Sequence, residues 1–110
     1  MLITWLLLGF VTGLVIGAFL DEIIDWAKKA FDRLSSAIKK AWVYIRRVPG
    51  GIKKMIEYIE NGKFKRETET EEVSWEEIEE RHRNGDIDDE TYNALKAERD
   101  KKIAELNRDL

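Results

Sequence analysis

The chain of 110 residues contains no cysteine, one histidine and one proline. Without cysteine it can form neither disulfides nor thiolate metal sites, and it has no cysteine nucleophile. The single histidine, His82, argues against a histidine-based metal site and against a Ser–His–Asp triad. The length allows one small domain or a few separate helices and excludes a large α/β enzyme. We therefore expect no enzyme, no cofactor and no metal.

Charge is absent from Leu2 to Leu20. A helix over this segment would be about 28 Å long, close to the hydrocarbon thickness of a bilayer. The sequence therefore predicts a transmembrane helix over residues 1–20, and a helix buried in a larger complex is the alternative. A cleaved signal peptide would need basic residues ahead of the apolar run, and none precedes it. Basic residues follow the run, so the positive-inside rule predicts a single-pass protein of the bacterial inner membrane, mostly cytoplasmic.

Three glycines, Gly9, Gly13 and Gly17, are spaced four residues apart and would share one face of that helix. Glycine allows helix backbones to approach closely in lipid. The spacing predicts self-association, and the alternative is that glycine is simply frequent in membrane helices.

Residues 21–48 have apolar positions in alternating steps of three and four, which predicts a long amphipathic helix continuing the first. Pro49 ends it. The residues expected to pack in helix association are Phe31, Leu34, Ile38 and Ile45. The opposite face is basic and is expected to contact lipid or a polyanion through Lys28, Lys29, Arg33, Lys39, Lys40, Arg46 and Arg47. Packing in a helix bundle and binding at a membrane surface both fit this helix, whereas nucleic-acid binding lacks an accompanying motif.

Charge is divided along the chain. Residues 28–66 contain twelve basic and three acidic residues, whereas residues 67–110 contain seven basic and sixteen acidic ones. This division favours a basic section near anionic lipid or another polyanion, followed by an acidic section held away from it or folded onto it. The alternative is that both sections are ordinary solvated helix faces.

The middle of the chain predicts one short helix within residues 49–62, with Asn61-Gly62 as its end. Residues 63–73 follow as a linker. The alternating acids and threonines of residues 67–72 have no apolar side, which is typical of an exposed linker or an edge strand.

Residues 74–110 predict a helical hairpin. Ser74 and Glu77 form a capping box, Gly85 closes the first helix, and Asp88 caps the second. The second helix is expected to continue almost to the end of the chain. The apolar residues that would dock a partner are Trp75, Ile78, Ile87, Tyr92 and Leu95.

This hairpin resembles the short C-terminal (SHOCT) domain, a helical hairpin found at the ends of many bacterial and phage proteins. The resemblance covers roughly 30 residues and rests on Ile78 and, within NGDIDDETYNALK, on Gly85, Ile87, Asp88, Glu90, Tyr92, Ala94 and Lys96. Thr91 stands where the family usually has Glu, and the chain continues past Lys96. The resemblance implies oligomerisation or partner docking, and it implies no catalysis.

Together these patterns predict an all-α protein: a transmembrane helix, a long amphipathic helix, a short third helix and a C-terminal helical hairpin. The expected function is a non-catalytic, membrane-anchored assembly protein that self-associates and presents its hairpin to an unidentified protein partner. One alternative is a holin-like or other membrane-perturbing pore former. Another is a structural subunit of a phage virion or secretion assembly.

Overall fold

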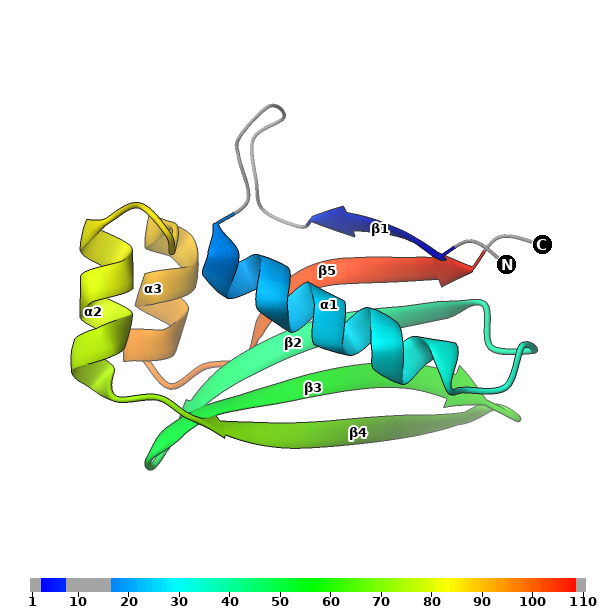
Figure 1. The fold of residues 1–110 in the computed structure, drawn as a ribbon. Helices are drawn as coiled ribbons and strands as arrows, with labels where there is room; N and C mark the ends of the chain where they lie inside the picture. Colours follow the sequence, from blue (N-terminus) through cyan, green and yellow to red (C-terminus); the bar gives the residue numbers. More distant parts are fainter. Residues whose placement is uncertain (1–2, 8–16, 109–110) are drawn as a thin grey trace.

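The computed structural model describes residues 3–7 and 17–108, which form an antiparallel sheet, one helix across a face of it and a helical hairpin at one end (Figure 1). The sheet has the strand order β1-β5-β2-β3-β4. The elements in chain order are β1 (Ile3–Leu7), α1 (Ala18–Asp32), β2 (Lys40–Val48), β3 (Gly51–Glu60), β4 (Lys63–Glu72), α2 (Trp75–Arg83), α3 (Asp89–Lys96) and β5 (Lys101–Arg108).

The prediction of an all-α fold is wrong, and the predicted helix over residues 21–48 shows why. Its first part is helical, and α1 buries Ile24, Ala27 and Phe31 as the apolar spacing indicates. The helix then ends at Asp32, and residues 40–48 form β2. Burial in β2 follows the two-residue period of a strand, with Ala41 and Val43 fully buried. A run that is apolar at nearly every position satisfies helix and strand periods together, so spacing alone could not distinguish them.

The predicted short helix within residues 49–62 is also wrong, because residues 51–60 form β3. Asn61 and Gly62 both have positive φ, at 53° and 77°, and they form the tight turn between β3 and β4. Asn-Gly is a strong signal for a β-hairpin turn as well as for the end of a helix. From the sequence, it was interpreted only as the end of a helix. The predicted linker forms the edge strand β4, exposed along its length, which agrees with the edge-strand alternative.

The predicted transmembrane helix over residues 1–20 is contradicted. Residues 3–7 form strand β1 and pair antiparallel with β5, and α1 begins only at Ala18. Within the described ranges, no helix has the length and apolar character needed to cross a bilayer. The membrane localisation and the membrane-anchored assembly function therefore lose their basis, as does the holin-like alternative. The virion or secretion subunit was built on helical packing of residues 1–48, and it loses its basis too.

The main core lies between α1 and the sheet, where α1 contributes Ile24, Ala27 and Phe31. The strands supply small and branched side chains, among them Val43 of β2 and Leu106 of β5, both fully buried. The same core extends to the helical hairpin through Ile78, Ile87 and Leu95. The hairpin is therefore packed on the sheet layer as part of one domain.

The helical hairpin itself is present as predicted for residues 74–96. The Ser74 hydroxyl accepts the Glu77 N–H at 3.1 Å, and the Asp88 carboxylate accepts the Thr91 N–H at 3.1 Å. Gly85 has a φ of 81°, which glycine adopts readily. The predicted continuation past Lys96 is wrong, because residues 101–108 turn back and form β5 between β1 and β2.

Candidate functional site

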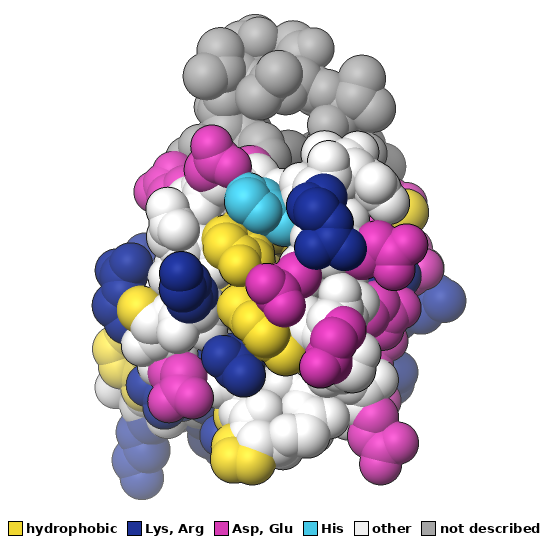
Figure 2. All heavy atoms as spheres, turned by 90° about the vertical axis from the view of Figure 1, so that its left-hand side faces the viewer, with side chains coloured by type: hydrophobic (Ala, Val, Ile, Leu, Met, Phe, Trp, Pro, Cys, Tyr) yellow, Lys and Arg dark blue, Asp and Glu magenta, His cyan; other side chains and the backbone are white. Residues whose placement is uncertain are grey.

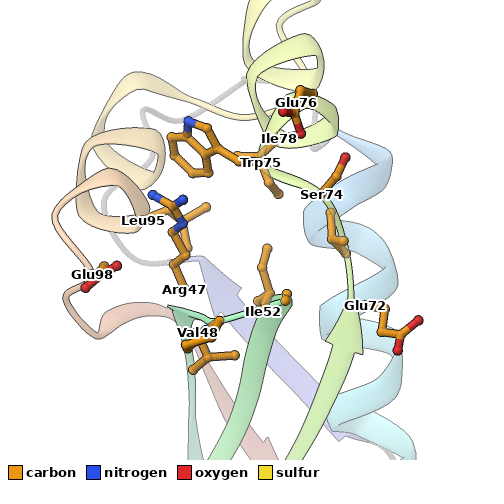
Figure 3. Close-up of a pocket in the computed structure, with 14 residues that line it drawn as sticks. Arg47, Val48, Ile52, Glu72, Ser74, Trp75, Glu76, Ile78, Leu95 and Glu98 are labelled. Carbon is orange, nitrogen blue, oxygen red and sulfur yellow. The ribbon is translucent and has the colours of Figure 1, made fainter.

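A pocket of about 510 Å³ lies where the turn between β2 and β3 faces the helical hairpin (Figure 3). Three segments enclose it: the turn itself, the connection from β4 to α2, and the ends of α2 and α3. Its lining consists of Arg47, Val48, Pro49, Gly50, Gly51, Ile52, Glu72, Val73, Ser74, Trp75, Glu76, Ile78, Leu95 and Glu98.

Two glycines shape the turn that forms the lower wall of the pocket. Gly50 has a φ of 84°, in the left-handed region that favours glycine. At Gly51 a β-carbon would lie 1.9 Å from the Glu71 carbonyl oxygen, so only glycine allows β3 to start this close to β4. The Val73 N–H donates to the Gly50 carbonyl at 3.3 Å and joins the turn to the segment that leads into α2. The wall is therefore set by backbone geometry.

The inner part of the pocket is apolar. Ile52, Ile78 and Leu95 are almost fully buried and come from β3, α2 and α3 respectively. Val73 and Trp75 are partly exposed and pack against the same core. Figure 3 shows the Ile52 side chain pointing up from the end of β3 into the space below Trp75 and Ser74. An apolar group of a ligand would therefore meet an apolar surface on several sides.

A stacked column of side chains forms one wall of the pocket and continues beyond it. The Arg47 guanidinium lies 4.0 Å from the centre of the Trp75 ring, and Trp75 stacks on Tyr92 with ring centres 5.5 Å apart. Tyr92 stacks in turn on His82 at 3.9 Å, and His82 Nε2 lies 2.7 Å from the Asp89 carboxylate. In Figure 2 hydrophobic side chains gather below the histidine at this end of the molecule. These contacts hold the Trp75 ring in one orientation.

Carboxylates surround the apolar part. Glu72, Glu76 and Glu98 line the pocket, where Arg47 is the only basic residue. A smaller cavity of about 160 Å³ adjoins it and shares Glu72 and Val73. The remaining lining of the smaller cavity is Phe19, Glu22, Glu71, Glu77 and Arg81. Together the two linings contain six acidic and two basic residues, so this end of the molecule favours a cationic ligand.

The pocket lining contains one hydroxyl and three carboxylates. Its one hydroxyl, Ser74 Oγ, accepts the Glu77 N–H as the helix cap. No histidine, lysine or tyrosine lines the pocket to act as its base. Over residues 3–7 and 17–108, no three histidine or acidic side chains gather in a way that could hold a metal ion.

The predicted docking residues fall into two groups. Trp75, Ile78 and Leu95 line the pocket, and Tyr92 lies directly behind Trp75. Ile87 is buried in the core, away from the pocket lining. The turn from Val48 to Ile52 is a part of the site that was not predicted from the sequence. The signal was present in Pro49-Gly50-Gly51, which was interpreted only as the end of a helix.

The residues predicted for helix association do not form a shared helix face. Phe31, Ile38 and Ile45 lie in the core of the same chain, in α1, a loop and β2, and Leu34 packs against this core. Gly17 is the N-cap of α1, where a β-carbon would lie 2.4 Å from the Asp86 carbonyl oxygen. Gly9 and Gly13 lie outside the described residues.

The predicted basic face is likewise divided among several elements. Lys28 and Lys29 lie in α1, Arg33 caps its end, and Lys39 lies in the loop that follows. Lys40, Arg46 and Arg47 are in β2, where Arg46 pairs with Asp100 at 2.8 Å. Only Arg47 reaches the pocket.

Comparison with known proteins gives no match: no family model, no curated protein and no solved structure matches this chain. The resemblance of the helical hairpin to the short C-terminal domain therefore stays a prediction.

Proposed function

We propose that this protein is a non-catalytic recognition module that binds a short cationic segment of another protein. One apolar side chain of that segment enters the pocket between the β2–β3 turn and the helical hairpin. Lysine or arginine side chains on either side of it face the surrounding carboxylates.

The observation that carries this proposal is the combination of an apolar interior with an acidic surround. Val48, Val73 and Trp75 are partly exposed above the buried Ile52, Ile78 and Leu95, and they provide apolar surface that a ligand side chain can remove from water. Glu72, Glu76 and Glu98 stand around that surface, and Glu22 and Glu77 extend the acidic region into the adjoining cavity. A ligand that is both apolar and cationic satisfies both parts at once.

The contact between Arg47 and Trp75 supports the same choice of ligand. An arginine stacked on tryptophan is stabilised by the electron-rich face of the ring. The site thus already holds one guanidinium on its aromatic wall, 4.0 Å from the ring centre. Tyr92 covers the other face of this ring, so a ligand arginine would find the same chemistry by taking the place of Arg47.

Recognition also agrees better than catalysis with the side chains present. The lining combines carboxylates with apolar groups, and its serine hydroxyl is used as a helix cap. We therefore propose that the pocket holds its ligand without changing it chemically.

Binding can be tested with fluorescein-labelled hexapeptides that contain one Leu, Phe or Trp flanked by Lys or Arg, measured by fluorescence anisotropy. The pocket variant is Glu72→Lys with Glu76→Lys. The control is Asp32→Lys with Glu80→Lys, which changes the net charge equally at exposed positions outside both cavities. We expect the pocket variant to weaken binding by at least about tenfold and the control by less than about threefold.

Peptides provide the second control. Replacing Lys and Arg of the peptide by Glu, or its apolar residue by Gly, should each abolish measurable binding. Equal weakening by both protein variants would show general charge attraction and contradict a pocket site. The absence of binding by every cationic apolar peptide would contradict the proposed function altogether.

A further inference from the structure

The sheet has a second face, opposite to α1, that no described element covers. In Figure 1 α1 lies across one face only, and the helical hairpin lies beyond one end of the strands. Ala41, Val43 and Ile45 of β2 are fully buried in the core that contains α1, so the residues between them point to the other side. We refer to that other side as the open face.

The open face has several aromatic and apolar side chains, on β2, β3 and β4. Strand pairing places Tyr44 beside Met55, Trp42 beside Glu57, and Ile59 beside Phe64. Met55, which pairs with Tyr44 and Thr68, is 1% exposed and is no member of the core cluster that contains α1. Phe64 is 73% exposed and Ile59 46%, the two large apolar side chains most open to solvent among the described residues.

The same face has an excess of positive charge. Its register brings together Lys40, Arg46, Lys53, Arg66 and Lys102. Three of these are paired: Arg66 with Glu57, Lys40 with Glu105 at 3.3 Å, and Arg46 with Asp100 at 2.8 Å. This local excess contrasts with the formal net charge of −3 for the chain.

Two lysines of the open face contribute little to the stability of the folded chain. Lys53 lies directly opposite Arg46 across β2 and β3, and like charges in that position repel. Lys102 lies opposite Tyr44, with its ammonium 5.6 Å from the centre of that ring. Among the described residues, neither lysine has a carboxylate partner. An anionic ligand would remove the repulsion.

We propose that the open face binds single-stranded nucleic acid. Bases stack on the rings of Trp42, Tyr44 and Phe64, and phosphates lie against the lysine and arginine side chains. The open face of the sheet presents no helix or narrow ribbon that could enter a duplex groove, whereas unpaired bases can reach its aromatic side chains. The threonines Thr68 and Thr70 on the same face can donate to phosphate or base oxygens.

This surface meets the acidic pocket at Glu72, at the end of β4, and its test changes none of the residues that the proposed function uses. The first measurement is anisotropy of a fluorescein-labelled oligothymidine and an oligouridine, each about 12 nucleotides long, mixed with the full chain at several salt concentrations. We expect binding whose affinity falls linearly with salt on a logarithmic scale, and weaker binding of a DNA duplex of equal length.

Two kinds of variant locate the site. Lys53→Glu with Lys102→Glu should weaken binding by at least about tenfold. Arg83→Glu with Lys96→Glu, two exposed cations of the helical hairpin, makes the same charge change and should weaken it by less than about threefold. Phe64→Ala removes a side chain that is largely in solvent, so the fold is kept, and loss of a stacking platform should weaken binding by about fivefold or more.

The proposal is overturned if neither oligonucleotide binds at low salt, if the two charge variants have equal effects, or if Phe64→Ala binds as the unaltered chain does. Vesicles of phosphatidylcholine with phosphatidylserine provide the remaining arm. The proposal is also overturned if the unaltered chain sediments with these vesicles but binds neither oligonucleotide, and if the variant Lys53→Glu with Lys102→Glu no longer sediments. That result would assign the face to anionic lipid.

Discussion

Arg108 shows how a single charged side chain can hold two layers together. It is buried, and its guanidinium donates to the Leu34 and Ser35 carbonyl oxygens at 3.4 and 2.9 Å and to that of Phe31. The Phe31 carbonyl belongs to the last turn of α1, where free acceptors and the negative end of the helix dipole favour a cation, and the other two carbonyls lie in the loop that follows. The last turn of α1 is thereby tied to β5.

Replacing Arg108 by Ala should lower the free energy of unfolding by about 3 kcal/mol, since buried carbonyl oxygens lose their donors and the Phe31 ring loses its cation. Arg99→Ala, at an exposed position, should change it by less than about 0.5 kcal/mol. Urea denaturation followed by circular dichroism measures both. Similar stability of the two variants would show that the Arg108 contacts contribute little.

Tyr58 gives a pH dependence that can be checked. Burial raises the pKa of the Tyr58 phenol above its usual value of 10.0, and the carboxylates of Glu67 and Glu60 raise it further. The folded chain therefore holds this proton more tightly than the unfolded chain. The resulting stabilisation is fully present below about pH 10 and is lost as the pH rises through the folded pKa.

We expect the difference in unfolding free energy between the unaltered chain and Tyr58→Phe to change between about pH 9 and pH 11. The unaltered chain should lose more stability over this range than the phenylalanine variant does. Urea titrations at fixed pH values provide the measurement. Parallel pH profiles would contradict a raised pKa at this position.

At the scale of elements, Asp86 joins the helical hairpin to α1. Its carboxylate accepts the Phe19 N–H at 3.3 and 3.4 Å and pairs with Arg81 at 2.9 Å. It thus caps α1 from a distant part of the chain, while Gly17, the N-cap by position, supplies no side-chain acceptor. The close approach that makes this possible leaves no room for a β-carbon at Gly17.

Gly17→Ala should therefore lower the free energy of unfolding by about 2 kcal/mol, because the hairpin must shift away from α1. Its effect on amide hydrogen exchange should be strongest in the first turn of α1 and around Arg81. Gly62→Ala provides a comparison at a position where a β-carbon meets no atom but φ is positive. If hydrogen exchange near Asp86 is unchanged in Gly17→Ala, the contact does not couple the two elements.

The elements that sequence could predict are those specified by local chemistry. Ser74 and Asp88 are capping residues whose hydrogen bonds join them to amides three positions on, so the helices they start were correctly placed. The strands depend on partners far along the chain. Residues 40–48 and 101–108 become strands because they pair with each other. The local sequence of either segment does not reveal this distant partner.

At the scale of the whole molecule, the candidate site was predictable only in part. Trp75, Ile78 and Leu95 were recognised as a docking surface, but the pocket exists because the β2–β3 turn faces them. The division of charge along the sequence was observed correctly. Folding redistributes it, since Glu69 and Glu71 of β4 come to lie beside Lys54 of β3, and only part of the basic block reaches the open face.

The arrangement of β1 has a consequence for how the polypeptide reaches its native state. Ile3 pairs with Arg108, and among residues 3–7 and 17–108 the strand beside β1 is β5 alone. Within the described part of the chain, a nascent β1 segment therefore has no sheet partner until β5 has been synthesised. The closing of so large a loop is entropically costly, so β1 is expected to dock late, after the β2–β3–β4 meander has formed from neighbouring segments.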